Sequence, residues 1–169
     1  MHFIEKSYRV PCCIQFWQNK FNIEITEWNW LIVRKSTKES RLIELHWKIL
    51  HNIYPTNIVL YKMGIVPNTK CFYCKDKTDF IEHFFFECNK ISHIWKLVAQ
   101  QIYKKHNIKV KLEAVNVLLG FNSDTYSDMI VRYINLLIII AKMCIGKYRY
   151  GTPLDISILE RELDLRGLS

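Results

Sequence analysis

Glycine and proline are scarce in this sequence, and their scarcity limits the folds that it can adopt. The 169 residues include five glycines and four prolines, with no internal repeat, low-complexity tract or Gly/Ser-rich linker. A sandwich of short strands needs many turns built from these residues, whereas helices joined by short loops need few. The sequence therefore predicts a mostly α-helical protein with at most a few short strands.

Signals for export and for membrane insertion are also lacking. Three of the first ten residues are charged and no uninterrupted apolar stretch follows them, so we expect no secretory signal. The most apolar segment, residues 130–145, contains Arg132 and Lys142, and inserting each of these into a bilayer costs about 2.5–3.5 kcal/mol. We therefore expect a buried core helix there, no membrane partner, and an intracellular protein of the nucleus or the cytoplasm.

A catalytic arrangement of residues is the third absence. No serine, cysteine or carboxylate group stands in a pattern that supports nucleophilic or acid–base catalysis. We therefore expect no enzymatic activity from this chain by itself, and no small-molecule substrate.

Apolar residues at helical spacing, in contrast, are abundant. Leu42, Leu45 and Ile49 predict a helix over residues 41–54, which Pro55 ends. The same reasoning predicts helices at 57–63, after Asn89, from about 124 to 148, and from Thr152-Pro153 to about Leu165.

Aromatic residues make up 14% of the chain and supply much of the expected core. Several lie in residues 12–30, where residues 22–26 alternate in polarity like a short strand. Because large aromatic rings are mostly buried, we assign all five tryptophans to the core. They are Trp17, Trp28, Trp30, Trp47 and Trp95.

The most specific signal is a set of three cysteines and one histidine. Cys71 and Cys74 are two residues apart, His83 follows after eight residues, and Cys88 after four more. Sulfur and imidazole donors at such spacing are typical of structural zinc sites, in which four protein ligands leave no open position for a catalytic water. The sequence therefore predicts one structural Zn²⁺ ion, with His83 on a short helix capped by Asp79.

Two other readings of the same residues remain open. Cys71 and Cys74 alone could form a redox pair, but that reading does not explain His83 and Cys88, and no βαβ pattern surrounds the pair. The four residues could also be unrelated core residues at this spacing by coincidence. We favour zinc, because it accounts for all four positions.

The elements divide the chain into three expected parts. Residues 1–40 are an aromatic-rich N-terminal lead-in, residues 41–106 a helical zinc-binding domain, and residues 107–169 a helical C-terminal tail packing on it.

The sequence resembles the zinc-binding region of reverse transcriptases, as it occurs at the C-terminal end of LINE-type (non-LTR) retrotransposon polyproteins. The resemblance is carried by RLIELHWKILHNIYPTN at residues 41–57, Gly64-Ile65, the Cys/Cys/His/Cys set, and IEHFFFEC at 81–88 with Trp95 behind it. It is firm over about residues 28–100 and looser from there to the C-terminus. No Tyr-x-Asp-Asp polymerase motif and no endonuclease carboxylate set accompanies it. The chain therefore looks like a detached C-terminal piece: a gene fragment, a domesticated copy or a truncated gene model.

The resemblance implies a non-catalytic accessory domain that helps to hold template RNA or target DNA, and it carries the four zinc ligands over residue by residue. The parent element's polymerase domain is a further expected partner. The net charge of +8 agrees with a polyanionic partner bound without sequence preference. The candidate phosphate contacts are Lys70, Lys75, Lys77, Arg132, Lys142, Lys147 and Arg149.

Each of these basic residues also has a simpler interpretation. Asp128, Arg132, Asn135, Lys142 and Arg149 recur at steps of three, four or seven, which predicts a polar stripe that is solvated whether or not it binds phosphate. The rival function is a structural or protein-interaction module, in which zinc only stabilises the fold.

Overall fold

Helices make up the regular structure of the described residues, 12–149 and 156–168, of this computed structural model. In chain order they are α1 (Cys12–Phe21), α2 (Glu27–Ser36), α3 (Ser40–Leu50), α4 (Asn57–Lys62), the π-helical turn η1 (His83–Glu87), the 3-10 turn η2 (Asn89–Ile91), α5 (Ser92–His106), α6 (Ala114–Leu119), α7 (Asp128–Tyr148) and α8 (Ile156–Asp164). Within these ranges, β pairing is limited to an isolated antiparallel bridge between Lys70 and Thr78. The predicted mostly α fold is confirmed.

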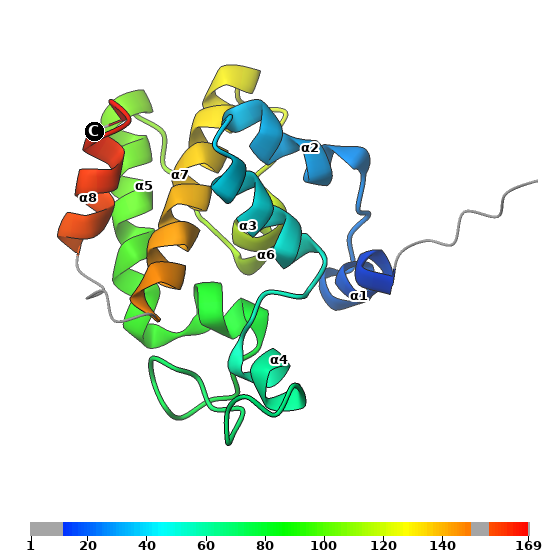
Figure 1. The fold of residues 1–169 in the computed structure, drawn as a ribbon. Coiled ribbons are helices and arrows are strands. Elements are labelled where there is room, and N and C mark those ends of the chain that lie inside the picture. Colours follow the sequence, from blue (N-terminus) through cyan, green and yellow to red (C-terminus); the bar gives the residue numbers. More distant parts are fainter. Residues whose placement is uncertain (1–11, 150–155, 169) are drawn as a thin grey trace, which may run out of the picture.

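The most apolar segment of the sequence forms α7, the central helix of the fold (Figure 1). Helices α2, α3, α5 and α8 pack against it, and every residue from Leu137 to Gly146 is buried. By length and composition alone α7 could cross a membrane, but most of that apolar stretch is buried inside the protein. Its packing is that of the core helix that the sequence predicts.

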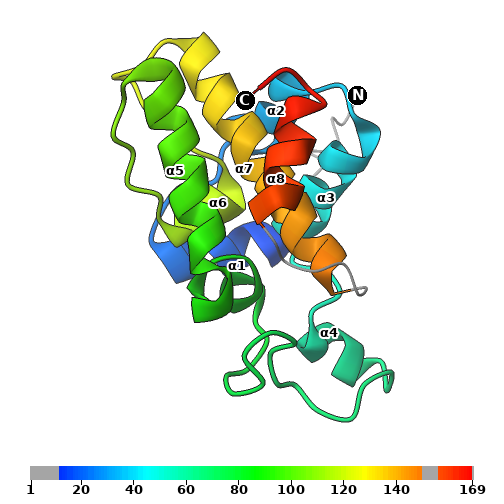
Figure 2. The same ribbon diagram turned by 90° about the vertical axis from the view of Figure 1, so that its left-hand side faces the viewer.

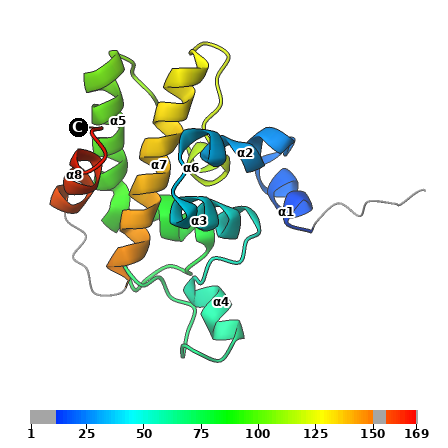
Figure 3. The ribbon, with the colours of Figure 1, turned by 45° about the horizontal axis from the view of Figure 1, so that its top comes forward.

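Two flanks cover α7 in the views of Figures 1 and 3. Helices α5 and α8 lie side by side along one flank, and α2 and α3 along the other. The short helix α6 packs on α3 and η1. One cluster of buried residues runs from Trp17 to Leu163, so α1 and α8 share a single hydrophobic core with the helices between them.

Helix α4 and the loop of residues 63–80 project from one end of this helical body (Figures 1, 2 and 3). None of the residues of α4 is buried. Helix α4 therefore adds no buried residue to the core, and the loop after it carries two of the predicted zinc ligands.

Two local predictions differ from the structure because asparagines adopt left-handed backbone conformations. The helix predicted over 41–54 stops at Leu50, and Asn52 follows it with a φ of 53°. Residues 22–26 contain no strand, and Asn22, with a φ of 52°, follows the end of α1. The predicted start of the last helix at Thr152-Pro153 lies outside the described residues.

The tryptophans meet the core prediction with one exception. Trp17 and Trp95 are buried, and each indole N–H donates to a backbone carbonyl. Trp28 and Trp30 are half-buried against the core. Trp47 is 45% exposed, so its assignment to the core is wrong. Helix α3 packs on α2 and α7 through another face, and Trp47 lies outside that face.

The predicted polar stripe on α7 is also wrong. Asp128 and Arg132 are exposed and ion-paired, but Asn135 and Lys142 are only 2% and 1% exposed. The same helix face is open at its N-terminal end and covered by packed helices further along. Lys142 therefore cannot contact a phosphate, and it is removed from the candidate nucleic-acid contacts. The Asn135 amide instead exchanges two hydrogen bonds of 2.8 Å with the backbone of Phe121.

Burial changes the protonation of Lys142 and of its neighbour His46 on α3. Burial lowers the pKa of Lys142 from 10.5 to about 7. Burial, together with the charge of Lys142, lowers the pKa of His46 to about 3. The His46 Nε2 atom lies 2.9 Å from the Asn29 carbonyl oxygen, so it carries the proton and donates. The fold therefore favours the uncharged forms of both side chains.

Replacing Lys142 with methionine is expected to stabilise the protein at neutral pH. The unfolded chain keeps a protonated lysine up to a pKa of 10.5, whereas the folded chain gives up that proton near pH 7. Folding at pH 7 therefore costs roughly 2–4 kcal/mol that Lys142→Met removes, and the gain shrinks as the pH rises towards 10.5. Urea unfolding at pH 7 and pH 10 measures both values. Arg132→Met, an exposed change on the same helix, is the control, and a gain equal at the two pH values would contradict the argument.

Candidate metal centre

Backbone hydrogen bonds shape residues 71–77 into a tight knuckle. The N–H of Cys71 donates to the carbonyl of Lys77 at 2.7 Å, and the N–H of Lys75 donates to the carbonyl of Cys71 at 3.0 Å. Lys75 adopts a left-handed φ of 59°, which closes the turn. The N–H of Tyr73 points at the Cys71 sulfur, 3.4 Å away. The knuckle thus presents the sulfurs of Cys71 and Cys74 on one side.

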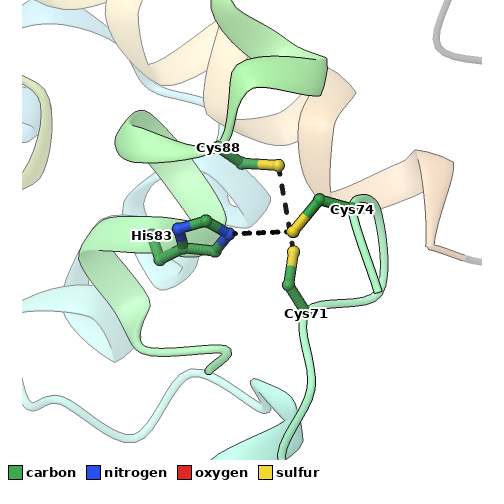
Figure 4. A group of neighbouring side chains, drawn as sticks. All are labelled: Cys71, Cys74, His83 and Cys88. Carbon is green, nitrogen blue, oxygen red and sulfur yellow. Dashed lines mark hydrogen bonds between the residues drawn. The ribbon is translucent and has the colours of Figure 1, made fainter. Parts of the chain in front are cut away.

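The other two ligands flank the π-helical turn η1: His83 is its first residue, and Cys88 directly follows its last residue. The N–H of Cys88 donates to the carbonyl of His83 at 3.1 Å, a hydrogen bond across five residues. In an α-helix of 3.6 residues per turn, side chains five apart point in different directions. The wider turn brings His83 and Cys88 to the same side, as Figure 4 shows. Single π-helical turns of this kind are frequent at functional sites.

The four ligand atoms converge, and all lie within 4.8 Å of one another. The sulfurs of Cys71 and Cys88 are 3.9 Å apart, and the Cys74 sulfur lies 3.5 Å from His83 Nε2 (Figure 4). A tetrahedral zinc ion with ordinary bond lengths separates two sulfurs by about 3.8 Å, and a sulfur from an imidazole nitrogen by about 3.6 Å. These spacings fit zinc, and the distance between the two sulfurs is far too long for a disulfide.

Burial and hydrogen bonding shift the pKa values of the three thiols in different directions. Cys71 and Cys88 are fully buried, and burial raises the pKa of both. Burial also acts to raise the pKa of Cys74, but hydrogen bonds from the N–H groups of Lys77 and Asp76 and from His83 outweigh it, and bring the value to about 6. Cys74 is thus the thiol that loses its proton most readily. The four residues form a possible zinc site whose donors are all thiol or imidazole.

Tyr73, inside the knuckle, ties the site to the central helix. Its hydroxyl donates to the carbonyl of Ile145 on α7 at 2.6 Å, and its ring stacks on Tyr148 with centroids 5.3 Å apart. The ring of Phe84, between two of the ligands, lies 5.1 Å from that of Tyr73. These contacts hold the projecting loop against the helical body.

Asn57 forms structural contacts next to the candidate site that the sequence did not predict. Its N–H donates to the Asp79 carboxylate at 2.7 Å, its side-chain amide donates to the Lys70 carbonyl, and its amide oxygen accepts from Arg149. Asp79 therefore caps α4 from a distance, rather than capping the helix of His83 as predicted. The only available sequence signal was the position of Asn57 directly after Pro-Thr, where a helix was expected to start.

The structure places the remaining candidate basic residues at four different positions. Lys70, Lys75 and Arg149 line one cleft beside the knuckle, and Lys77 borders the opening next to Cys74 and His83. Arg132 lies 17 residues before Arg149 on α7, about 25 Å along the helix axis, and pairs with Asp128. Lys147 pairs with Glu162 of α8 at 2.7 Å. The sequence could not separate these positions, because Arg132 and Lys147 lie on the same helix, α7, and Arg149 directly follows it.

Tyr73→Phe is expected to loosen the knuckle. It removes the hydroxyl that donates to the Ile145 carbonyl of α7, so the free energy of unfolding falls by about 1 kcal/mol. Thermal unfolding of the zinc-loaded protein measures the change. Tyr103→Phe, at a tyrosine that is 48% exposed, should leave the melting temperature unaltered. Equal effects of the two substitutions would show that the hydroxyl does not anchor the loop.

Comparison with known proteins agrees with this geometry. A family model described as zinc-binding in reverse transcriptase matches residues 8–95, just over half of the chain, and the matched segment contains all four ligands. No curated protein and no solved structure matches the chain. The chain therefore belongs to the family of reverse-transcriptase zinc-binding domains.

Proposed function

We propose that the protein is a non-catalytic accessory domain of a LINE-type retroelement that binds RNA or DNA without sequence preference, and that one structural zinc ion shapes its binding surface. The observation that carries this proposal is the cleft beside the knuckle, which places Lys70, Lys75 and Arg149 together. We further propose that it acts inside the cell, in the nucleus or the cytoplasm.

The zinc ion of this proposal is structural because protein ligands fill its whole coordination shell. Cys71, Cys74, His83 and Cys88 supply four donors, so no position is left for a water that could attack a substrate. Three thiolates and a neutral imidazole give the loaded site a net charge of about −1. Lys70, Lys75 and Lys77 around the knuckle balance that charge and leave a positive surface.

The knuckle cleft has a volume of about 500 Å³ and the chemistry of a phosphate site. Among the described residues, three cations line it and no carboxylate does. The Lys75 ammonium lies 4.3 Å from the centre of the Phe72 ring, and the Arg149 guanidinium is held by the Pro55 carbonyl and the Asn57 amide oxygen. Because these two side chains are already held in place, they lose little conformational entropy when they bind a phosphate.

A protein-interaction role is the second candidate, favoured by the tip of α4 and the residues after it. Tyr61, Met63 and Ile65 are 51%, 66% and 65% exposed, which is unusual for three apolar side chains so close in sequence. In this alternative, the parent element's polymerase domain covers these residues and zinc only stabilises the fold.

Metal analysis tests the zinc half of the proposal. We expect one zinc ion per purified chain, lost in Cys74→Ser and His83→Ala together with the folded structure, because zinc supplies about 10–16 kcal/mol in small zinc domains. Cys12→Ser, at an exposed cysteine outside the site, is the matched control and should keep both. A well-folded, metal-free wild-type protein would refute this half.

Titration with labelled single-stranded RNA and duplex DNA across salt concentrations tests the nucleic-acid half. Replacing both Lys70 and Lys75 with alanine should weaken binding to RNA and to DNA. The slope of log K against log salt should become shallower by about one to two units, because each lost phosphate contact reduces that slope by about 0.7–0.9. The matched control replaces Lys104 and Lys109, which are exposed beyond the knuckle cleft. If wild-type protein binds neither ligand at low salt, the nucleic-acid role is wrong and the protein-interaction candidate stands.

A further inference from the structure

Trp47 is an exposed tryptophan that lies beside two other rings on the surface of α2 and α3. Its ring lies 4.2 Å from that of His51, and the ring of Trp30 lies 5.1 Å from the same imidazole. His51 is thus flanked by two indoles on the side of α2 and α3, away from the zinc ligands. With 45% of its surface exposed, Trp47 keeps a large part of its aromatic surface open to a ligand.

Trp30 and Trp47 line a cleft between α2 and α3 of about 480 Å³. Its walls are mostly apolar, with Ile14, Ile43 and Leu50 among them. It continues over Trp47 and Ile43 into a shallow depression bounded by Arg34 and Lys38. The α2–α3 cleft is therefore an apolar, aromatic slot with cations at one end, and its volume falls in the range of ordinary ligand sites.

The charges at its rim favour an anionic ligand. Arg34 and Lys38 are exposed, and neither forms an ion pair with any residue between 12 and 149 or between 156 and 168. Glu44 is neutralised by Lys48 at 2.7 Å. Glu27, on the first turn of α2, is the remaining acid among the described residues of the lining. The cationic end adjoins Trp47, so a ligand stacked on the indole has positive charge beside it.

Aromatic faces next to unpaired cations are how proteins hold single strands. Bases stack on the rings while phosphates follow the positive groups, and stacking is worth about ten-fold or more in affinity per base. A duplex offers no free base face, because its bases are already stacked within the helix. An apolar protein segment would fill the slot, but it would leave Arg34 and Lys38 without counter-charge.

We infer that the α2–α3 cleft binds an unpaired base of a single-stranded nucleic acid, which stacks on Trp47 while the neighbouring phosphates contact Arg34 and Lys38. The inference rests on the proposed nucleic-acid function and adds to it a preference for single strands. The knuckle cleft contacts phosphates of any strand, and the α2–α3 cleft selects those whose bases are free.

The experiment uses the full zinc-loaded chain and three probes: a short single-stranded oligothymidine, the same backbone without bases, and a duplex. Trp47→Ala should weaken binding of the oligothymidine about ten-fold and leave the other two unchanged, because only the first offers a base to stack. Trp47→Phe keeps an aromatic face and should restore binding to within about two-fold. Phe80→Ala, at an aromatic that is 52% exposed and outside the cleft, is the matched control.

The outcomes separate this inference from the function on which it rests. If Trp47→Ala binds all three probes like wild type while loss of Lys70 and Lys75 weakens them, the stacking site is wrong, the nucleic-acid role survives, and a protein partner becomes the occupant of the α2–α3 cleft. If wild-type protein binds no probe, both are wrong.

Should Trp47→Ala lose zinc or unfold, replacing Arg34 and Lys38 with alanine decides the question. That variant should weaken binding of the oligothymidine several-fold more than binding of the duplex, and an equal effect on both would overturn the inference.

Discussion

The convergence of four ligand atoms within 4.8 Å is where the projecting knuckle meets the turn that carries the other two ligands. The knuckle at residues 71–77 belongs to a projecting loop, and α4 beside it has no buried residue. The turn η1, by contrast, is packed into the core through Phe84 and Phe85, which are fully buried. A metal ion bound to both the knuckle and η1 would therefore transfer the rigidity of the core to the loop. Without such a bond, two buried thiols with raised pKa values would face each other with no strong partner.

Hydrogen bonds around the candidate metal centre connect it to the cations of the knuckle cleft on the protein surface. Tyr73 connects the knuckle to α7, and Asn57 connects α4 to Asp79, Lys70 and Arg149. Arg149 follows the last residue of α7, so the cation that closes the knuckle cleft is positioned by the central helix. The cleft is thus assembled from three separate stretches of chain. A loosened knuckle would separate its cations and increase the entropy lost on binding a phosphate.

Features that depend on local residue spacing could be predicted from the sequence. The exposure of a side chain could not, where helices distant in the sequence determine it. Cys71, Cys74, His83 and Cys88 lie within 18 residues, and metal geometry restricts their spacing, so the ligand set could be read directly. The helical fold followed from apolar periodicity and few turn residues. Lys142 and Trp47 could not be placed, because each lies on a helix whose solvent exposure changes with the partners packed on it. Neither periodicity nor charge reveals that α7 is covered at Lys142, or that α3 leaves Trp47 uncovered.

These two failures differ in their physical meaning. Burying Lys142 and exposing Trp47 both cost stability, but Lys142 has no route to a ligand, whereas Trp47 borders a cleft with unpaired cations. A strand held only by the knuckle cleft would be bound through its charge, and its affinity would fall steeply with salt. Stacking on an indole is far less sensitive to salt and requires an unpaired base. A protein with both clefts could therefore hold single-stranded nucleic acid at salt concentrations that release a duplex. The salt dependence of binding, rather than the affinity at one salt concentration, therefore distinguishes binding in both clefts from binding to a basic surface alone.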